Sequence, residues 1–320
     1  MNTPTKLGLY GLSLTVAFAG AVGVGRLAGP EPRQPAAHEI SPDHADASSG
    51  SPERATDGAS LPGGLQVSEA GYRLAPVTPS LPVGTATDFS FRIIGPDQQP
   101  VTSFTATHER DLHLIIVRRD LSGFQHLHPN LGPNGVWSQP LTVTEAGQYR
   151  FFADFRPAGR AEALTLGVDV PAPGAYEPHL LPPSATTARV DGYDIALTGA
   201  LVPGTSSRLT LRVTRNGAPV TDLQPYLGAY GHLVALRDGD LAYLHVHPDG
   251  EPGDGRTPAG PEIVFHAEVP STGVYRLFLD FRHDGVVRTA EFTAVAGEAQ
   301  TAPPTAPSPT GDADQPHGHG

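Results

Sequence analysis

Cysteine is absent from this 320-residue chain, and methionine occurs once, as Met1. The absence of cysteine excludes disulfides, thiolate metal sites, cysteine nucleophiles and a lipid-modified cysteine anchor. The lack of internal methionine excludes thioether ligands, so a copper or zinc site in this chain must use nitrogen or oxygen donors.

Basic residues are also few: Lys6 is the one lysine, and the formal net charge is −12. An acidic chain without a basic stripe is repelled by a phosphate backbone, so we expect no nucleic-acid partner. The sequence also lacks a Gly-x-Ser-x-Gly elbow, a P-loop and a dinucleotide-binding fingerprint. We therefore do not expect an enzyme.

The one long apolar run lies at the N-terminus, where residues 7–25 carry no charge. It is long enough to cross a hydrocarbon layer of about 30 Å as a helix. Residues 1–28 are therefore predicted to be a signal-anchor helix, with the membrane as partner, or a cleaved signal peptide, because residues 17–19 (Ala-Phe-Ala) resemble a cleavage site. The rest of the chain is expected on the extracytoplasmic face of the cell membrane, or secreted if the signal is cleaved.

Glycine and proline are abundant, and three segments that are rich in small residues and proline have no hydrophobic periodicity. Residues 29–63 and 172–188 are predicted to be linkers, and residues 297–320 a disordered tail that contains histidine. The segments between them, residues 64–171 (repeat 1) and 189–296 (repeat 2), are copies of one unit. Such a unit is too long for a solenoid repeat, so the chain is predicted to contain two duplicated domains.

Each repeat alternates apolar and polar residues in short runs separated by turn signals, as in residues 89–93 and 209–213. This pattern predicts an all-β fold with two tandem immunoglobulin-like β-sandwiches. Tyr149 and Tyr275 each follow a Gly-x pair, which is typical of a tyrosine corner in such sandwiches.

Histidine is the residue type that carries the chemistry, because the motif H-x12-H-x-H-P occurs twice with the same spacing. The six residues are His113, His126, His128, His232, His245 and His247. Residues two apart on a strand share one face. If the chain turns near Asp120, an antiparallel register pairs His113 with either His128 or His126. In both registers the three imidazoles share one face, with Cβ atoms about 5 Å apart.

Three convergent imidazoles are suited to a divalent transition metal such as copper or zinc. The alternative is that these histidines only pack or hydrogen-bond within the sheet. His108, His266 and Glu251 are candidates for additional ligands. Asp154 and Asp280 are candidates to accept a hydrogen bond from a ligating imidazole and so orient it, or they pair with nearby arginines.

The segments around both motifs, residues 113–129 and 231–248, resemble a poorly characterised family of secreted or membrane-anchored bacterial proteins, frequent in actinobacteria. Some of its members are described as heavy-metal-binding, so the resemblance implies a metal role.

We therefore expect a membrane-tethered protein that binds copper or zinc outside the cytoplasm, for sequestration, delivery or sensing, with metal-handling membrane proteins as partners. One alternative is a structural or interaction module whose histidines are incidental. Another is a cupin-like metalloenzyme, because Gly239, His245, His247 and Glu251 approach the first cupin motif.

Overall fold

The computed structural model describes residues 61–297, and within this range the chain is built from strands and one short 3₁₀ turn, Pro133–Gly135. The predicted all-β class is confirmed. The predicted N-terminal helix, most of the first linker and the tail beyond residue 297 lie outside the described residues. No helix in the described part of the chain is long and apolar enough to span a membrane.

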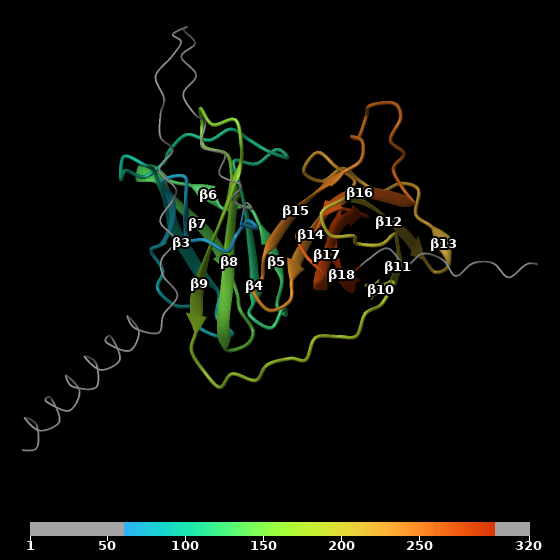
Figure 1. Ribbon diagram of the computed structural model, residues 1–320, viewed down its shortest axis with the longest axis horizontal. Helices are drawn as coiled ribbons and strands as arrows, with labels where there is room; N and C mark the ends of the chain where they lie inside the picture. Colours follow the sequence, from blue (N-terminus) through green and yellow to red (C-terminus); the bar gives the residue numbers. More distant parts are fainter. Residues whose placement is uncertain (1–60, 298–320) are drawn as a thin grey trace, which may run out of the picture. The chain divides into compact units, whose positions relative to one another are not determined.

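Repeat 1 is formed by two antiparallel sheets with a buried hydrophobic cluster between them (Figure 1). One sheet has the order β1-β2-β3-β7-β6 and the other has the order β5-β4-β8-β9. The strands are β1 (Ser68–Glu69), β2 (Tyr72–Pro76), β3 (Thr87–Ile94), β4 (Leu112–Arg118), β5 (Gln125–Leu127), β6 (Asn130–Leu131), β7 (Val136–Leu141), β8 (Gly147–Phe155) and β9 (Leu164–Ala172).

The strand order of repeat 1 corresponds to the immunoglobulin arrangement, with β2-β3-β7 as A-B-E and β5-β4-β8-β9 as C′-C-F-G. The predicted tyrosine corners are present in both repeats. The Tyr149 hydroxyl donates to the Glu145 carbonyl at 2.9 Å, and the Tyr275 hydroxyl donates to the Ser271 carbonyl at 3.0 Å. Each bond ties the start of a central strand to the turn that precedes it.

Repeat 2 has equivalent strands, but they form one continuous hydrogen-bonded path, β10-β11-β12-β16-β15-β14-β17-β18, with β13 paired to β12. Its strands are β10 (Thr187–Val190), β11 (Tyr193–Thr198), β12 (Ser206–Arg215), β13 (Ala218–Pro219), β14 (Gly231–Arg237), β15 (Tyr243–Pro248), β16 (Glu262–Glu268), β17 (Gly273–His283) and β18 (Val286–Ala296). The path is continuous because β15 pairs with β14 along its first residues and with β16 at its end.

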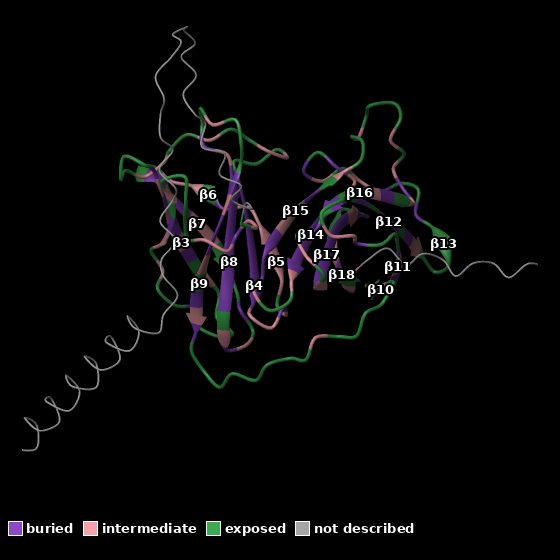
Figure 2. Ribbon diagram, in the orientation of Figure 1, coloured by how far each residue is buried: buried purple, intermediate pink, exposed green. Residues whose placement is uncertain are grey.

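The central strands are buried on both faces, which Figure 2 shows as purple along β4 and β8. Leu112, Leu114 and Ile116 of β4 point into the core of repeat 1. The alternate residues of β4, Ile115 and Val117, belong instead to a cluster contributed by both repeats. Its buried members are Ile115, Val117, Leu121, Phe152, Val234, Leu236, Leu241, Tyr243 and Phe278. The two repeats therefore pack through equivalent sheet faces.

Aromatic contacts at this interface are reciprocal, as expected for a self-complementary contact between two copies of one surface. Phe124 of repeat 1 stacks on Phe278 of repeat 2, with ring centroids 3.9 Å apart. In the opposite sense, Tyr243 of repeat 2 lies 5.4 Å from Phe152 of repeat 1. The duplicated domains thus form an intramolecular counterpart of a twofold dimer.

The end of the predicted first linker is held in place rather than free. The Tyr243 amide donates to the Gly63 carbonyl at 3.0 Å, and the Gly64 amide donates to the Thr165 carbonyl at 2.8 Å. Gly64 has a φ of +73°, and a Cβ there would lie 2.4 Å from the Phe152 ring, so only glycine fits. Gly63 and Gly64 therefore belong to the folded unit, because their backbone bonds to both repeats.

Candidate metal centre

The strand register places the first histidine motif on one face, as predicted. Ile115 pairs with His126, and Leu114 pairs with Leu127, so the register is the one that sets His113 opposite His128. Because side chains alternate along a strand, His113 and His126 project from the same face of β4 and β5, and His128 directly follows β5. That face is the one turned toward repeat 2.

The three side chains converge closely enough to share one ion. One nitrogen from each of His113, His126 and His128 lies within 4.8 Å of the others. Their ring centroids are 5.3 Å (His113 to His126), 5.0 Å (His113 to His128) and 4.9 Å (His126 to His128) apart. His113 is only 3% exposed, so the site is enclosed.

Hydrogen bonds at the outer nitrogens fix the tautomers of two of these rings. His113 Nε2 lies 3.0 Å from the Thr107 carbonyl oxygen, which can only accept, so this nitrogen carries a proton. His126 Nδ1 lies 2.8 Å from a carboxylate oxygen of Asp280, and it carries a proton for the same reason. In the neutral rings, the inner nitrogens therefore hold lone pairs.

The two inner nitrogens, His113 Nδ1 and His126 Nε2, face each other at 3.1 Å. Two lone pairs at this separation repel unless a proton or a cation lies between them. Two nitrogen ligands at about 2.0–2.1 Å from a tetrahedral ion are separated by about 3.3 Å. The separation is therefore close to that of two ligands of one metal ion. The third ring fits this arrangement, because His128 Nε2 is buried without a hydrogen-bond partner among the described residues.

Burial favours the neutral state of His113 and His128, which is the state that binds a metal. Burial, and next the neighbouring His126, lowers the pKa of His113 to about 3. The same two causes lower the pKa of His128 to about 2. Burial also lowers the pKa of His232 to about 4. A proton is therefore a poor competitor for the lone pairs of His113 and His128.

The second motif is arranged differently. His232 Nε2 donates to the Tyr226 carbonyl at 2.8 Å, as His113 does to Thr107, and its ring lies 6.2 Å from that of His126. The backbone of His245 keeps the predicted register opposite Val234, but its side chain lies outside what the structure describes. His247 is exposed on β15, where it pairs with His266 of β16. The described side chains of repeat 2 thus do not form a second triad.

The predicted additional ligands are divided between two places. His108 lies inside the cluster, with ring centroids 6.1 Å from His113 and 5.5 Å from His232. His266 is exposed, with Nε2 3.8 Å from a carboxylate oxygen of Asp249. Glu251 is exposed in the loop after β15. Neither His266 nor Glu251 belongs to the triad.

Both predicted orienting carboxylates are buried beside the histidines. Asp280, 3% exposed, accepts from His126 of the other repeat rather than from Arg282. Asp154 pairs with His113 across β4 and β8, and it accepts a hydrogen bond from the Tyr243 side chain. Sequence spacing within one repeat contains no signal for a contact between repeats, so the cross-repeat partner of Asp280 was not predicted.

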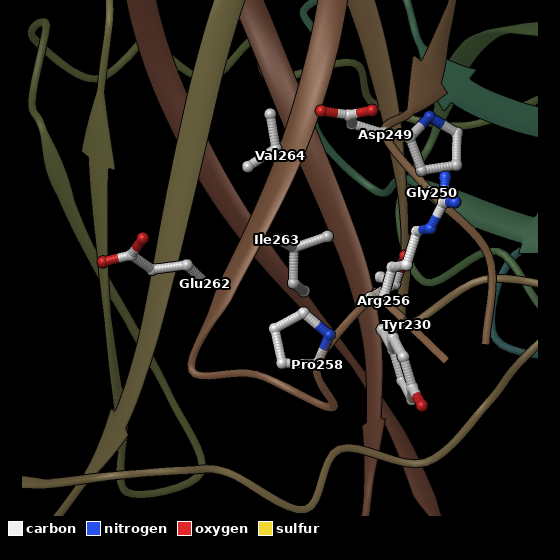
Figure 3. A pocket seen from close by; sticks show the side chains of 10 residues that line it. Tyr230, Asp249, Gly250, Arg256, Pro258, Glu262, Ile263 and Val264 are labelled. Carbon is white, nitrogen blue, oxygen red and sulfur yellow. The ribbon is translucent and has the colours of Figure 1, made fainter. Parts of the chain in front are cut away.

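Two further features lie away from the triad. His283 is buried, and its ring lies between the Tyr193 hydroxyl at 2.7 Å and a carboxylate oxygen of Asp222 at 3.0 Å. A surface pocket of about 270 Å³ is lined by Tyr230, Arg256 and neighbouring residues (Figure 3). It falls below the range of about 300–1,000 Å³ that is typical of small-molecule sites.

The fold and the site define a class: a tandem all-β protein with a histidine cluster enclosed between two duplicated domains. A family model described as "Domain of unknown function (DUF8832)" matches residues 66–172 and 188–298. The chain therefore belongs to this family and carries two copies of its domain. No curated protein matches the chain.

Several solved structures are similar to the chain at low identity. The Escherichia coli adhesin FdeC is 15% identical, with a TM-score of 0.23 and coverage of 72% of this chain and 65% of that one. InvD of Yersinia pseudotuberculosis is 12% identical, with a TM-score of 0.23 and coverages of 74% and 62%. A putative membrane anchored protein of Corynebacterium diphtheriae is 11% identical, with a TM-score of 0.21 and coverages of 74% and 61%. The chain thus spans less than two thirds of each, and likenesses this weak carry no inference about function.

Proposed function

We propose that this protein binds one divalent transition metal ion through His113, His126 and His128. The observation that carries the proposal is the pair of lone-pair nitrogens, His113 Nδ1 and His126 Nε2, held 3.1 Å apart. A cation relieves their repulsion. The lowered pKa values of His113 and His128 favour a metal ion over a proton. The buried Nε2 of His128 supplies the third ligand.

Three neutral imidazoles without sulfur ligands favour borderline ions, so the proposed ion is Zn²⁺ or Cu²⁺. Three protein ligands leave a fourth coordination position for water or another donor. The enclosed position of His113 supports retention or transfer of the ion rather than turnover of a substrate. We therefore propose a non-enzymatic role in sequestration, delivery or sensing.

The proposed location is outside the cytoplasm, with the N-terminal apolar segment as anchor or signal. The support for this is the uncharged run of residues 7–25. An ion bound there is exposed to oxidising conditions, in which imidazole ligands persist and thiolates are prone to oxidation.

A structural module with incidental histidines is the second candidate, favoured by the apolar contact between the repeats. In that case the facing nitrogens share a proton instead of a metal ion. The two candidates differ in whether the chain takes up a stoichiometric ion.

The test is metal titration of the metal-free full chain with Zn²⁺ and Cu²⁺. His38, His44, His317 and His319, which lie outside the described residues, are replaced by alanine throughout, so that only histidines of residues 61–297 contribute. We expect one tight equivalent, a loss of affinity of at least about a hundredfold in His128→Ala, and unchanged binding in the matched surface variant His266→Ala. Equal binding by His128→Ala and the parent would refute the proposal.

A further inference from the structure

We propose that repeat 2 completes the metal centre of repeat 1 by supplying Asp280, the residue that positions the His126 ring. Ion binding is then coupled to the docking of the two repeats. This inference rests on the proposed function. It adds which residue orients the His126 ligand and how ion binding is regulated.

Asp280 is fixed at both carboxylate oxygens. One oxygen accepts from His126 Nδ1 at 2.8 Å, and the other accepts from the Thr289 hydroxyl at 2.6 Å. The second bond holds the carboxylate, and the carboxylate holds the imidazole ring with its Nε2 toward His113. Carboxylate–histidine–metal arrangements raise the basicity of the ligating nitrogen and fix its tautomer.

The charge at Asp280 also points to a cation. The carboxylate is 3% exposed, and its hydrogen-bond partners are an imidazole and a hydroxyl. Among the described residues it forms no ion pair with an arginine. A buried carboxylate without a cationic partner is costly. A metal ion on the opposite side of a neutral His126 ring would supply a positive charge close to this carboxylate.

The apolar interface sets the position of this polar contact. Phe124 and His126 lie two residues apart on one repeat, and Phe278 and Asp280 lie two residues apart on the other. Phe124 stacks on Phe278 at 3.9 Å, and His126 bonds to Asp280 at 2.8 Å. Phe278 and Asp280 share one face of β17, so the two contacts are neighbours along the interface between the repeats. Displacement of the contact between Phe124 and Phe278 therefore displaces the Asp280 carboxylate from His126.

Separation of the repeats thus removes the carboxylate that orients His126 and weakens ion binding. A bound ion, in turn, opposes the separation. Coupling of this kind is reciprocal, so a factor gained in docking equals the factor gained in ion affinity. Whatever opens the interface, such as a protein that receives the ion, would lower the affinity of the site.

The experiment measures Zn²⁺ affinity by chelator competition in the full chain with the same four histidines replaced. Asp280→Asn keeps the shape and removes the charge, and we expect affinity to fall about 10- to 100-fold with the stoichiometry unchanged. Asp194→Asn, an exposed carboxylate of repeat 2, is the matched control and should bind like the parent. If the parent binds no ion, the proposed function fails. If the parent and Asp280→Asn bind equally, only the role of Asp280 is refuted.

A double-mutant cycle distinguishes positioning from a general structural effect. In a His126→Ala background Asp280 has no ligand to orient, so Asp280→Asn should change affinity no further. An additional loss of the same factor would refute action through His126. If Asp280→Asn does not fold, Thr289→Val provides the test. It removes the hydrogen bond from the Thr289 hydroxyl to the Asp280 carboxylate while the carboxylate keeps its charge. We expect about a threefold to tenfold loss of affinity, and unchanged affinity would overturn the inference.

Discussion

Acidification tests the buried state of the histidine cluster directly. The pKa of His113 is lowered to about 3 and that of His232 to about 4, in each case chiefly by burial. In the unfolded chain both titrate near a pKa of 6.5, the ordinary value for histidine. As the pH falls from 7 to 5, the unfolded state binds protons that the folded state does not. The free energy of unfolding therefore decreases across this window.

The magnitude follows from the two pKa values of each residue. Between pH 7 and pH 5, a histidine that titrates near 6.5 only when unfolded removes about 2 kcal/mol of stability. His113 and His232 together then remove about 4 kcal/mol, a large fraction of the stability of an ordinary domain. His128 contributes in the same direction, because its pKa is also lowered.

The assay is urea unfolding of the metal-free chain at pH 7 and pH 5 with a chelator present. Trp137, the single tryptophan, is buried in the core of repeat 1 and reports unfolding by fluorescence. His232→Gln retains a donor for the Tyr226 carbonyl but cannot titrate, so its loss of stability should be smaller by about 2 kcal/mol. His179→Gln, at an exposed position, is the control. A stability independent of pH, or an unchanged loss in His232→Gln, would refute the reasoning.

Four smaller predictions follow from the packing and the proposed ion. Phe278→Ala should lower the free energy of unfolding by about 3–5 kcal/mol, because it removes a buried ring at the interface; a loss below 1 kcal/mol in urea titrations would contradict that burial. Tyr149→Phe should cost about 1 kcal/mol by leaving the Glu145 carbonyl without its donor, as measured in the same titrations. Gly64→Ala should lower the thermal midpoint, since its Cβ would collide with the Phe152 ring, whereas alanine at the open position Gly192 should cost less. Zn²⁺ at about a hundred times its dissociation constant should stabilise the fold by about 2.7 kcal/mol, and a chelator should reverse the gain.

Local patterns in the sequence were sufficient to predict each repeat and the face of its histidines. Alternation identified the strands, and the Gly-x-Tyr pattern identified the corners at Tyr149 and Tyr275. The spacing between His126 and His128 determined a shared face without knowledge of the register. These features depend on residues close in sequence, so one sequence can determine them.

The interface between the repeats was the feature that the sequence left unpredicted. β4 has apolar residues on both faces, and its run Leu114–Val117 contains no polar residue. A continuous apolar run of this kind indicates a strand covered on both sides. It does not identify the covering surface, because the contact of His126 with Asp280 spans 154 positions of the chain. The cluster was therefore predicted as two separate sites instead of one shared junction.

The alignment of the repeats also concealed a shift in one turn. Residues 100–129 align with residues 219–248 without a gap, which sets Asp120 against Gly239. In the structure Asp120 pairs with Arg118 and Asp240 pairs with Arg237, so Asp240 is the equivalent residue. A one-residue insertion before the aspartate is offset by a deletion after it, and the register of the histidine strands is preserved.

The end of β15 explains why equal motifs need not give equal sites. β5 ends at Leu127, and His128, which directly follows it, lies beside His113 and His126. β15 continues to Pro248 and pairs with β16, which carries His247 to an exposed position opposite His266. The same spacing thus places the third histidine inside one repeat and outside the other. We therefore expect one tight ion for each chain, and two equivalent tight ions in a titration would show that this difference in strand pairing does not decide the stoichiometry.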